Sequence, residues 1–227
     1  MESTILKTLS TSAIAVAVIA VPATAGDMML EFGTNTAFEM AEQDVFVDDG
    51  NGSVKRIRPA DTDNMMDAKL FGATVSPPFQ PMNFEPSETY GKGLELGITL
   101  EEWLSASAKG TFACDGGKSV FNVEFTGLRP NAVYTMWNFI DADPPTDPWQ
   151  GILYPLGARD GSDAAFTSDA DGNAVYSVTF EPCIEASGTQ TMAGVAAAWH
   201  PDGKTHGSSP GKLGVDSFAH VMAGFTQ

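Results

Sequence analysis

The sequence predicts a mainly β protein: an antiparallel β-sandwich with one disulfide, one short helix and an irregular N-terminal segment. Short stretches of alternating polar and apolar residues recur after residue 106, and turn residues separate them. The chain has 227 residues, enough for one substantial core, and an even pair of cysteines. We therefore expect a signal peptide over residues 1–25, an N-terminal segment over 26–105 and a sandwich over 106–227.

The first 25 residues are typical of an export signal. Lys7 precedes the apolar run AIAVAVIAV at 13–21, and the small residues ATA follow at 23–25. A bilayer span needs about 20 apolar residues, so this run is too short to be one. The sequence predicts an exported protein, periplasmic or extracellular, whose mature chain begins at Gly26. An uncleaved anchor is the alternative.

The formal net charge of −17 restricts the possible partners. Nucleic acids and anionic membranes both require a basic surface, so neither is expected as a partner, and we expect no membrane insertion after signal cleavage. Cations are favoured, although the charge is explained equally well as a solubility feature.

The N-terminal segment contains one hairpin signal and one helix signal. The stretches VFVDD and SVKRIRP flank the turn DDGNGS, which predicts a hairpin. Four prolines within residues 77–86 predict an extended connection. A helix is expected over 99–107, because Thr99 and Glu102 have the spacing of a capping box.

The later segments predict the strands of the sandwich. SVFNVEFTGL alternates cleanly, with its aromatic residues and Val123 on one face. In RPNAVYTMWNFI, Val133, Thr135 and Trp137 share a face. AAFTSDADGNAVYSVTF predicts a hairpin folded at 171–172. MAGVAAAWH is almost continuously apolar, which indicates a strand buried on both sides.

Cys114 and Cys183 predict a disulfide, because an even pair of cysteines in an exported chain favours one. Closing a loop of this length stabilises a fold by about 4 kcal/mol. The alternative is a thiolate metal ligand, since one cysteine with two histidines and a methionine suits a blue-copper site.

The segment AWHPDGKTHGSSPGKLGVDSFAH holds all three histidines of the chain. Pro201, Asp202 and Gly203 suit a three-residue hairpin turn with a glycine bulge, which places His200 and His206 on one face of a ribbon. A two-residue turn places them on opposite faces, and the proline favours the first arrangement.

His220 joins the other two histidines only if the intervening residues loop back, and Met222 lies just beyond it. Imidazoles with a thioether suit copper, whereas imidazoles with a carboxylate, such as the nearby Asp202 or Asp216, suit zinc or iron. The sequence thus predicts a copper or zinc site at His200, His206, His220 and Met222. The alternative is that these are ordinary polar loop residues.

Two acidic stretches are further candidates for binding sites. In DADPPTDPW, Asp141, Asp143 and Trp149 could bind a ligand such as a sugar, which would stack on the tryptophan; a rigid connection is the alternative. DADGN resembles half of a calcium loop, but Phe180 stands where an EF-hand needs glutamate, so we expect a turn there.

The segments FTGLRPNAVYTMWNF, PLGARDGS, DADGNAVYSVTFEPC and AWHPDGKTHGSSPG resemble an uncharacterised family of exported bacterial β-rich proteins. The resemblance covers roughly residues 96 to 225 and includes both cysteines and His200. It implies export and one β-rich domain, and it implies no activity.

No catalytic motif stands out, so we expect an exported, acidic, non-enzymatic module with a binding or structural role. Its ligand would be an extracellular polymer, a partner protein or a cation. The alternative is a copper- or zinc-binding protein, redox-active in one version, that uses the His200/His206 hairpin.

Overall fold

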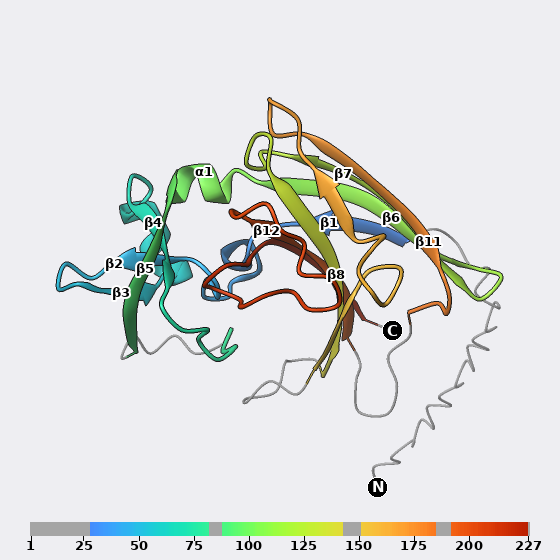
Figure 1. The fold of residues 1–227 in the computed structure, drawn as a ribbon, viewed down its shortest axis with the longest axis horizontal. Coiled ribbons are helices and arrows are strands. Elements are labelled where there is room, and N and C mark those ends of the chain that lie inside the picture. Colours follow the sequence, from blue (N-terminus) through green and yellow to red (C-terminus); the bar gives the residue numbers. More distant parts are fainter. Residues whose placement is uncertain (1–27, 82–87, 143–150, 185–191, 227) are drawn as a thin grey trace, which may run out of the picture.

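A computed structural model describes residues 28–81, 88–142, 151–184 and 192–226. The predicted signal peptide lies outside these ranges. Two antiparallel sheets form a sandwich, and a small barrel lies beside it (Figure 1). The predicted fold class is therefore confirmed. Within the described residues no helix is both long and apolar enough to cross a membrane.

Sheet 1 of the sandwich has the strand order β1-β6-β7-β11. These strands are β1 (Met28–Phe32), β6 (Ser107–Asp115), β7 (Lys118–Thr126) and β11 (Ala174–Phe180). On β7 the expected alternation is present, since Phe121, Val123 and Phe125 are buried between exposed or half-buried neighbours. Strand β1 comes from the predicted N-terminal segment, yet it pairs with β6 and completes this sheet.

Sheet 2 has the order β10-β8-β12-β13, and β9 also pairs with β8. Its strands are β8 (Val133–Asp141), β9 (Ile152–Pro155), β10 (Ala165–Thr167), β12 (Met192–His200) and β13 (Phe218–Thr226). Every residue from 193 to 200 on β12 is buried, which confirms a strand covered on both faces.

The predicted hairpin at 171–172 is wrong in its pairing, although the turn itself is present. Asp169 Oδ1 accepts hydrogen bonds from the backbone N–H groups of Asp171 and Asn173, at 2.9 and 2.8 Å. The flanking strands then diverge, because β10 pairs with β8 in sheet 2 and β11 pairs with β7 in sheet 1. The turn therefore connects the two sheets.

The core of the sandwich lies between the sheets. Phe121 and Phe125 of sheet 1 and Tyr134 and Met136 of sheet 2 are at most 1% exposed. Burying such a side chain contributes about 1.5–3 kcal/mol. Cys114 and Cys183 form the predicted disulfide, with their Cα atoms 5.6 Å apart, so the thiolate-ligand alternative is wrong.

The remaining N-terminal residues fold into a closed barrel that the sequence did not predict. In barrel order its strands are β2 (Phe46–Asp48), β3 (Ser53–Arg56), β5 (Thr89–Thr99) and β4 (Lys69–Ala73). The predicted hairpin is confirmed as β2 and β3. Two 3-10 helices lie in the same part of the chain: η1 (Asn35–Phe38) precedes β2, and η2 (Pro59–Asn64) lies between β3 and β4.

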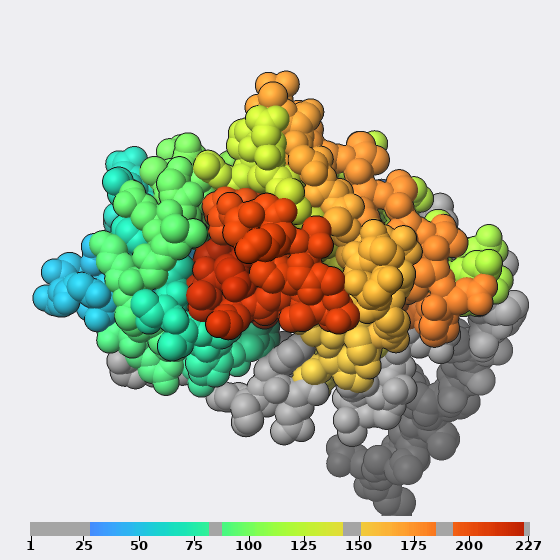
Figure 2. All heavy atoms as spheres, viewed as in Figure 1, coloured from blue at the N-terminus to red at the C-terminus, as the bar shows by residue number. Residues whose placement is uncertain are grey.

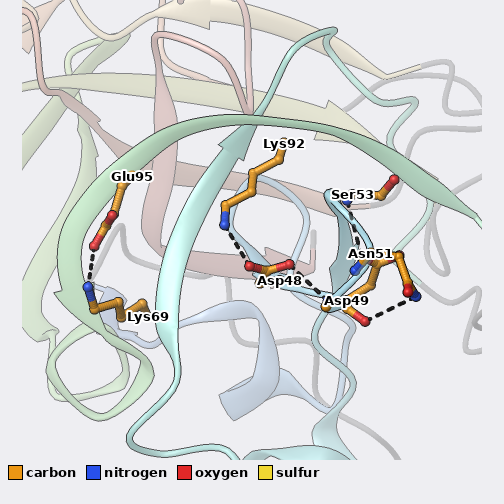
Figure 3. A network of polar contacts seen from close by, with 8 residues as sticks. Asp48, Asp49, Asn51, Ser53, Lys69, Lys92 and Glu95 are labelled. Atoms are coloured by element: carbon orange, nitrogen blue, oxygen red, sulfur yellow. Dashed lines mark hydrogen bonds and ion pairs between the residues drawn. The ribbon is translucent and has the colours of Figure 1, made fainter.

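Ion pairs cross the exposed side of the barrel, as Figure 3 shows. Lys92 Nζ lies 2.6 Å from Asp48 Oδ2, and Lys69 Nζ lies 2.8 Å from Glu95 Oε1. In the hairpin turn, Asp49 Oδ1 accepts from the backbone N–H of Asn51 at 2.8 Å. Exposed pairs of this kind contribute about 0.2–1 kcal/mol each, so barrel stability comes mainly from the apolar interior.

Helix α1 (Leu100–Leu104) connects the barrel to the sandwich. Its predicted capping box is present: the N–H of Glu102 donates to Thr99 Oγ1, and Glu102 Oε2 accepts from the N–H of Thr99. The helix is shorter than the expected 99–107, because strand β6 already begins at Ser107. Leu100 and Trp103 are completely buried.

Candidate functional site

The predicted turn after β12 is confirmed, but the predicted ribbon beyond it is wrong. The N–H of Gly203 donates to the carbonyl oxygen of His200 at 3.0 Å, and Gly203 has a φ of 72°, which favours glycine. No second strand follows: residues 201–217 form a long covering segment that leads to β13. Gly207, Pro210 and Gly211 interrupt any alternating strand pattern there.

The covering segment packs against two neighbouring regions. On the barrel side, the N–H of Ala73 donates to Gly214 O and Ser76 Oγ donates to Leu213 O, both at 2.7 Å. On the other side, Gly207 lies against Gly161. Figure 2 shows the segment as a continuous surface between the barrel and the chain that contains residues 151–165.

His200 is buried at the end of β12, with only 1% of its surface exposed. Its Nε2 lies 2.7 Å from Thr135 Oγ1, and this oxygen also accepts a 2.7 Å hydrogen bond from Trp137 Nε1. Its Nδ1 has no hydrogen-bond partner in the part of the chain that the structure describes. Burial, followed by the neighbouring His206, lowers the pKa of His200 to about 4. The ring is therefore neutral at neutral pH.

The covering segment brings His206 back to His200, with the ring centroids 5.3 Å apart. His206 has a φ of 57°, in the left-handed region, so it belongs to a turn and not to a strand. Its Nε2 lies 3.8 Å from Asp202 Oδ1, too far for a hydrogen bond. The two histidines thus lie together as predicted, although by a different route.

Asp216 and Ser217 complete what we call the histidine cluster: His200, Asp202, His206, Asp216 and Ser217. A Cβ atom placed on Gly211 would lie 2.8 Å from Asp216 Oδ1, 3.2 Å from Ser217 Cβ and 3.3 Å from His206 Cδ2. Those three side chains therefore surround one point. The negative charges of Asp202 and Asp216 raise the pKa of His200, but burial lowers it by more.

The histidine cluster is unusual in its unpartnered polar atoms. Among the described residues, six buried side-chain nitrogen or oxygen atoms lack a hydrogen-bond partner, and three belong to this cluster: His200 Nδ1, His206 Nε2 and Ser217 Oγ. Buried polar atoms are normally paired, because an unpaired one costs about 1–3 kcal/mol. Half of these atoms thus lie within one short stretch of chain.

His220 belongs to a separate cluster on the opposite face of sheet 2. Its Nδ1 lies 3.1 Å from Tyr134 Oη, and its Nε2 lies 2.9 Å from the carbonyl oxygen of Trp103. Tyr134 and Thr135 are consecutive on β8, so their side chains leave opposite faces. Because His200 contacts Thr135, the two histidines are separated by the sheet. Both ring nitrogens of His220 are engaged, which leaves none for a metal.

The structure does not bring Met222 to the histidine cluster either. Met222 pairs with Ala196 of β12, four residues before His200, and its backbone also bridges to Gly33. Four strand residues correspond to about 13 Å, well beyond the length of a metal–ligand bond. Of the four predicted metal ligands, only His200 and His206 lie together.

The predicted ligand-binding loop is described only at its first two residues, Asp141 and Ala142. Asp141 ends β8 and is buried, with Oδ1 accepting from the N–H of Ala142 at 2.8 Å and Oδ2 unpartnered. Asp143 and Trp149 lie outside the described residues. Their proposed role in ligand binding stays a prediction.

A buried acidic cluster, which the sequence did not predict, lies at the junction of the barrel and the sandwich. Glu42 is 0% exposed, and its carboxylate accepts hydrogen bonds from Asn35 Nδ2 at 3.2 Å and Trp103 Nε1 at 3.4 Å. Burial raises the pKa of Glu42 to about 7 and that of Asp44 to about 6. Asp44 Oδ2 accepts from the N–H of Ala219 on β13 at 2.9 Å.

Within the part of the chain that the structure describes, no group of three or more His, Cys, Asp or Glu side chains is arranged to hold a metal ion. A metal at the histidine cluster would therefore take two imidazole ligands from the protein. Comparisons with protein-family models, curated proteins and solved structures found no match to this chain. The resemblance to exported bacterial proteins stays a prediction.

Proposed function

We propose that this protein is an exported, non-enzymatic binding protein that holds a divalent copper or zinc ion through His200 and His206. One observation carries the proposal: two adjacent imidazoles each present a buried nitrogen that has no hydrogen-bond partner among the described residues. Imidazole nitrogen is a preferred ligand of both ions.

The surroundings support a cation and not an anion. Asp202 and Asp216 lie beside the two rings, and the chain as a whole carries a net charge of −17. A negative field of this kind attracts cations and repels anions. The Ser217 hydroxyl, also buried and without a hydrogen-bond partner among the described residues, is a further oxygen at the site.

The small number of protein ligands argues against a structural zinc site. Structural zinc sites are closed by four protein ligands, whereas sites with fewer keep open positions for water or another molecule. With His200 and His206 as the imidazole ligands, the remaining positions would be open to such molecules. The fold also has its own apolar core and a disulfide, both independent of the histidine cluster.

The test is metal binding by the mature protein, purified from the exported fraction without a metal-binding tag. We expect elemental analysis and calorimetric titration to give about one Cu²⁺ or Zn²⁺ per chain. His206→Ala and His200→Gln should each weaken binding at least about tenfold, because each removes one of two imidazole ligands. The glutamine amide keeps a partner for Thr135.

Two matched variants serve as controls. His220→Gln alters a histidine whose nitrogens are already engaged, and Ser208→Ala alters an exposed residue of the covering segment. Both should bind like the wild type once circular dichroism shows that they fold. If the folded wild-type protein takes up no metal, or His206→Ala binds as tightly, the proposal is wrong.

A further inference from the structure

The environment of His200 deepens the proposed function, on which the following inference rests. We infer that Thr135 is a positioning residue that presents His200 Nδ1 to the metal and reverses its hydrogen bond to His200 when the metal binds. The observation is the buried chain Trp137 Nε1, Thr135 Oγ1, His200 Nε2, with 2.7 Å at each step.

The three hydrogen-bonded side chains all belong to strands of sheet 2. Thr135 and Trp137 are two residues apart on β8 and therefore share a face. His200 lies on the adjacent β12 and pairs with Val133 of β8, which is two residues from Thr135 and on the same face. Each of the three is at most 2% exposed, so the ring of His200 has little freedom to rotate.

The number of available hydrogens fixes the direction of the bonds in the metal-free protein. A threonine hydroxyl donates one hydrogen and accepts up to two. The Trp137 N–H takes one acceptor position, because an indole nitrogen can only donate. If the Thr135 hydroxyl donates to His200 Nε2, the ring hydrogen is on Nδ1, and only that N–H lacks a partner.

The opposite direction is less favourable without a metal. If His200 Nε2–H donated to Thr135, both the Thr135 hydrogen and the Nδ1 lone pair would lack a partner among the described contacts. Each unpaired buried group costs about 1–3 kcal/mol. We therefore expect the Nδ1–H form in the metal-free protein.

Metal binding requires the other form. A metal bonds to the lone pair of Nδ1, so that nitrogen gives up its hydrogen, and Nε2 carries the hydrogen instead. The second acceptor position of Thr135 can take this Nε2–H while the first still holds the Trp137 N–H. Metal-bound histidines commonly donate their other N–H in this way, and loss of the acceptor weakens binding about 10–100-fold.

The test compares Thr135→Val with Thr135→Ser. Valine matches the shape of threonine but can neither donate nor accept, whereas serine can do both. We expect Zn²⁺ affinity, measured by competition with a chelator, to fall about tenfold in Thr135→Val, the low end of that range because the metal-free form also loses its hydrogen bond, and to stay within about threefold in Thr135→Ser. Thr179→Val, at an exposed position on β11, should leave the affinity unchanged.

A second readout does not depend on metal affinity. Nitrogen-15 NMR of the imidazole distinguishes the two ring forms, and we expect His200 to carry Nδ1–H without metal and Nε2–H with Zn²⁺. An Nε2–H form in the metal-free wild type would overturn the inference, even if Thr135→Val failed to fold.

Failure of the proposed function and failure of this inference are distinguishable. If the wild type binds zinc and folded Thr135→Val binds equally well, Thr135 is not a positioning residue, while the metal site stands. If the wild type binds no zinc but its His200 carries Nδ1–H, the hydrogen-bond direction is supported and the proposed function is wrong.

Discussion

At the scale of single residues, His200 and His220 illustrate how one residue type takes two roles on one sheet. Both are 1% exposed, and burial lowers the pKa of each to about 4. His220 has partners at both nitrogens and stacks on Trp103 at 3.8 Å, whereas His200 has a partner at one. His220 therefore has a structural role, whereas His200 has a nitrogen that can coordinate a metal ion.

Tyr134 fixes the hydrogen bonding of His220. Its hydroxyl accepts from the N–H of Arg129 at 2.9 Å and donates to His220 Nδ1. We expect Tyr134→Phe to lower the free energy of unfolding by about 1–3 kcal/mol, because it leaves that N–H and that nitrogen buried and unpaired. Urea denaturation measures the change.

The control for this prediction is Tyr90→Phe. Tyr90 also loses only a hydroxyl, but its partner is the exposed Glu88. Its effect should stay below about 0.5 kcal/mol. If both variants lost the same free energy of unfolding, the buried hydrogen bonds of Tyr134 would contribute no more to stability than an exposed one.

At the scale of elements, the capping box of α1 is the clearest local stabilising feature. Thr99→Ala removes the side-chain oxygen that accepts from the N–H of Glu102. We expect the free energy of unfolding to fall by about 1 kcal/mol, measured by urea denaturation. Glu101→Ala lies in the same turn outside the box, so its effect should stay within about 0.5 kcal/mol. A Thr99→Ala protein as stable as Glu101→Ala would contradict a capping role.

The elements that could be predicted from sequence are those with local causes. The α1 cap requires residues three apart, and the β2–β3 hairpin requires a turn between adjacent strands. Strands β10 and β11 failed as a hairpin because each finds its partner far along the chain. The barrel was missed for the same reason, since β5 pairs with both β3 and β4 and so closes it.

The candidate site was predictable in part. The turn at Pro201 suggested that His200 and His206 lie together, and Thr135 and Trp137 were expected on one face of a strand. That this face is also the one toward His200 depends on the register of β8 with β12, which no local pattern encodes. Glu42 was missed because its burial results from how the barrel packs against the sandwich.

At the scale of the whole molecule, stability responds to pH in two opposing ways. The raised pKa values of Glu42 and Asp44 mean that the folded state holds protons more tightly than the unfolded state. Their contribution is complete below pH 4 and is lost as the pH rises toward 7. His200 and His220 act oppositely, because their contribution is present above pH 6.5 and is lost toward pH 4.

Glu42→Gln isolates one part of this dependence. Glutamine keeps acceptor oxygen for Asn35 and Trp103 but does not ionise. We expect the variant to gain stability over the wild type as the pH rises from 4.5 to 7, by up to about 3 kcal/mol. Urea denaturation at several pH values measures it.

Glu31→Gln, at an exposed position on β1, controls for the change in net charge. A stability difference between Glu42→Gln and the wild type that does not vary with pH would mean that Glu42 is not buried as a titrating group.

The close docking of the covering segment also bears on how this sequence can diverge. A Cβ on Gly161 would lie 2.2 Å from Gly207 O, and one on Gly72 would lie 3.0 Å from Gly214 O. These contacts are made by bare backbone, so evolution cannot vary them through side chains. Among relatives that keep the two histidines together, glycine at 72 and 161 should therefore be retained even where the surrounding surface residues drift freely.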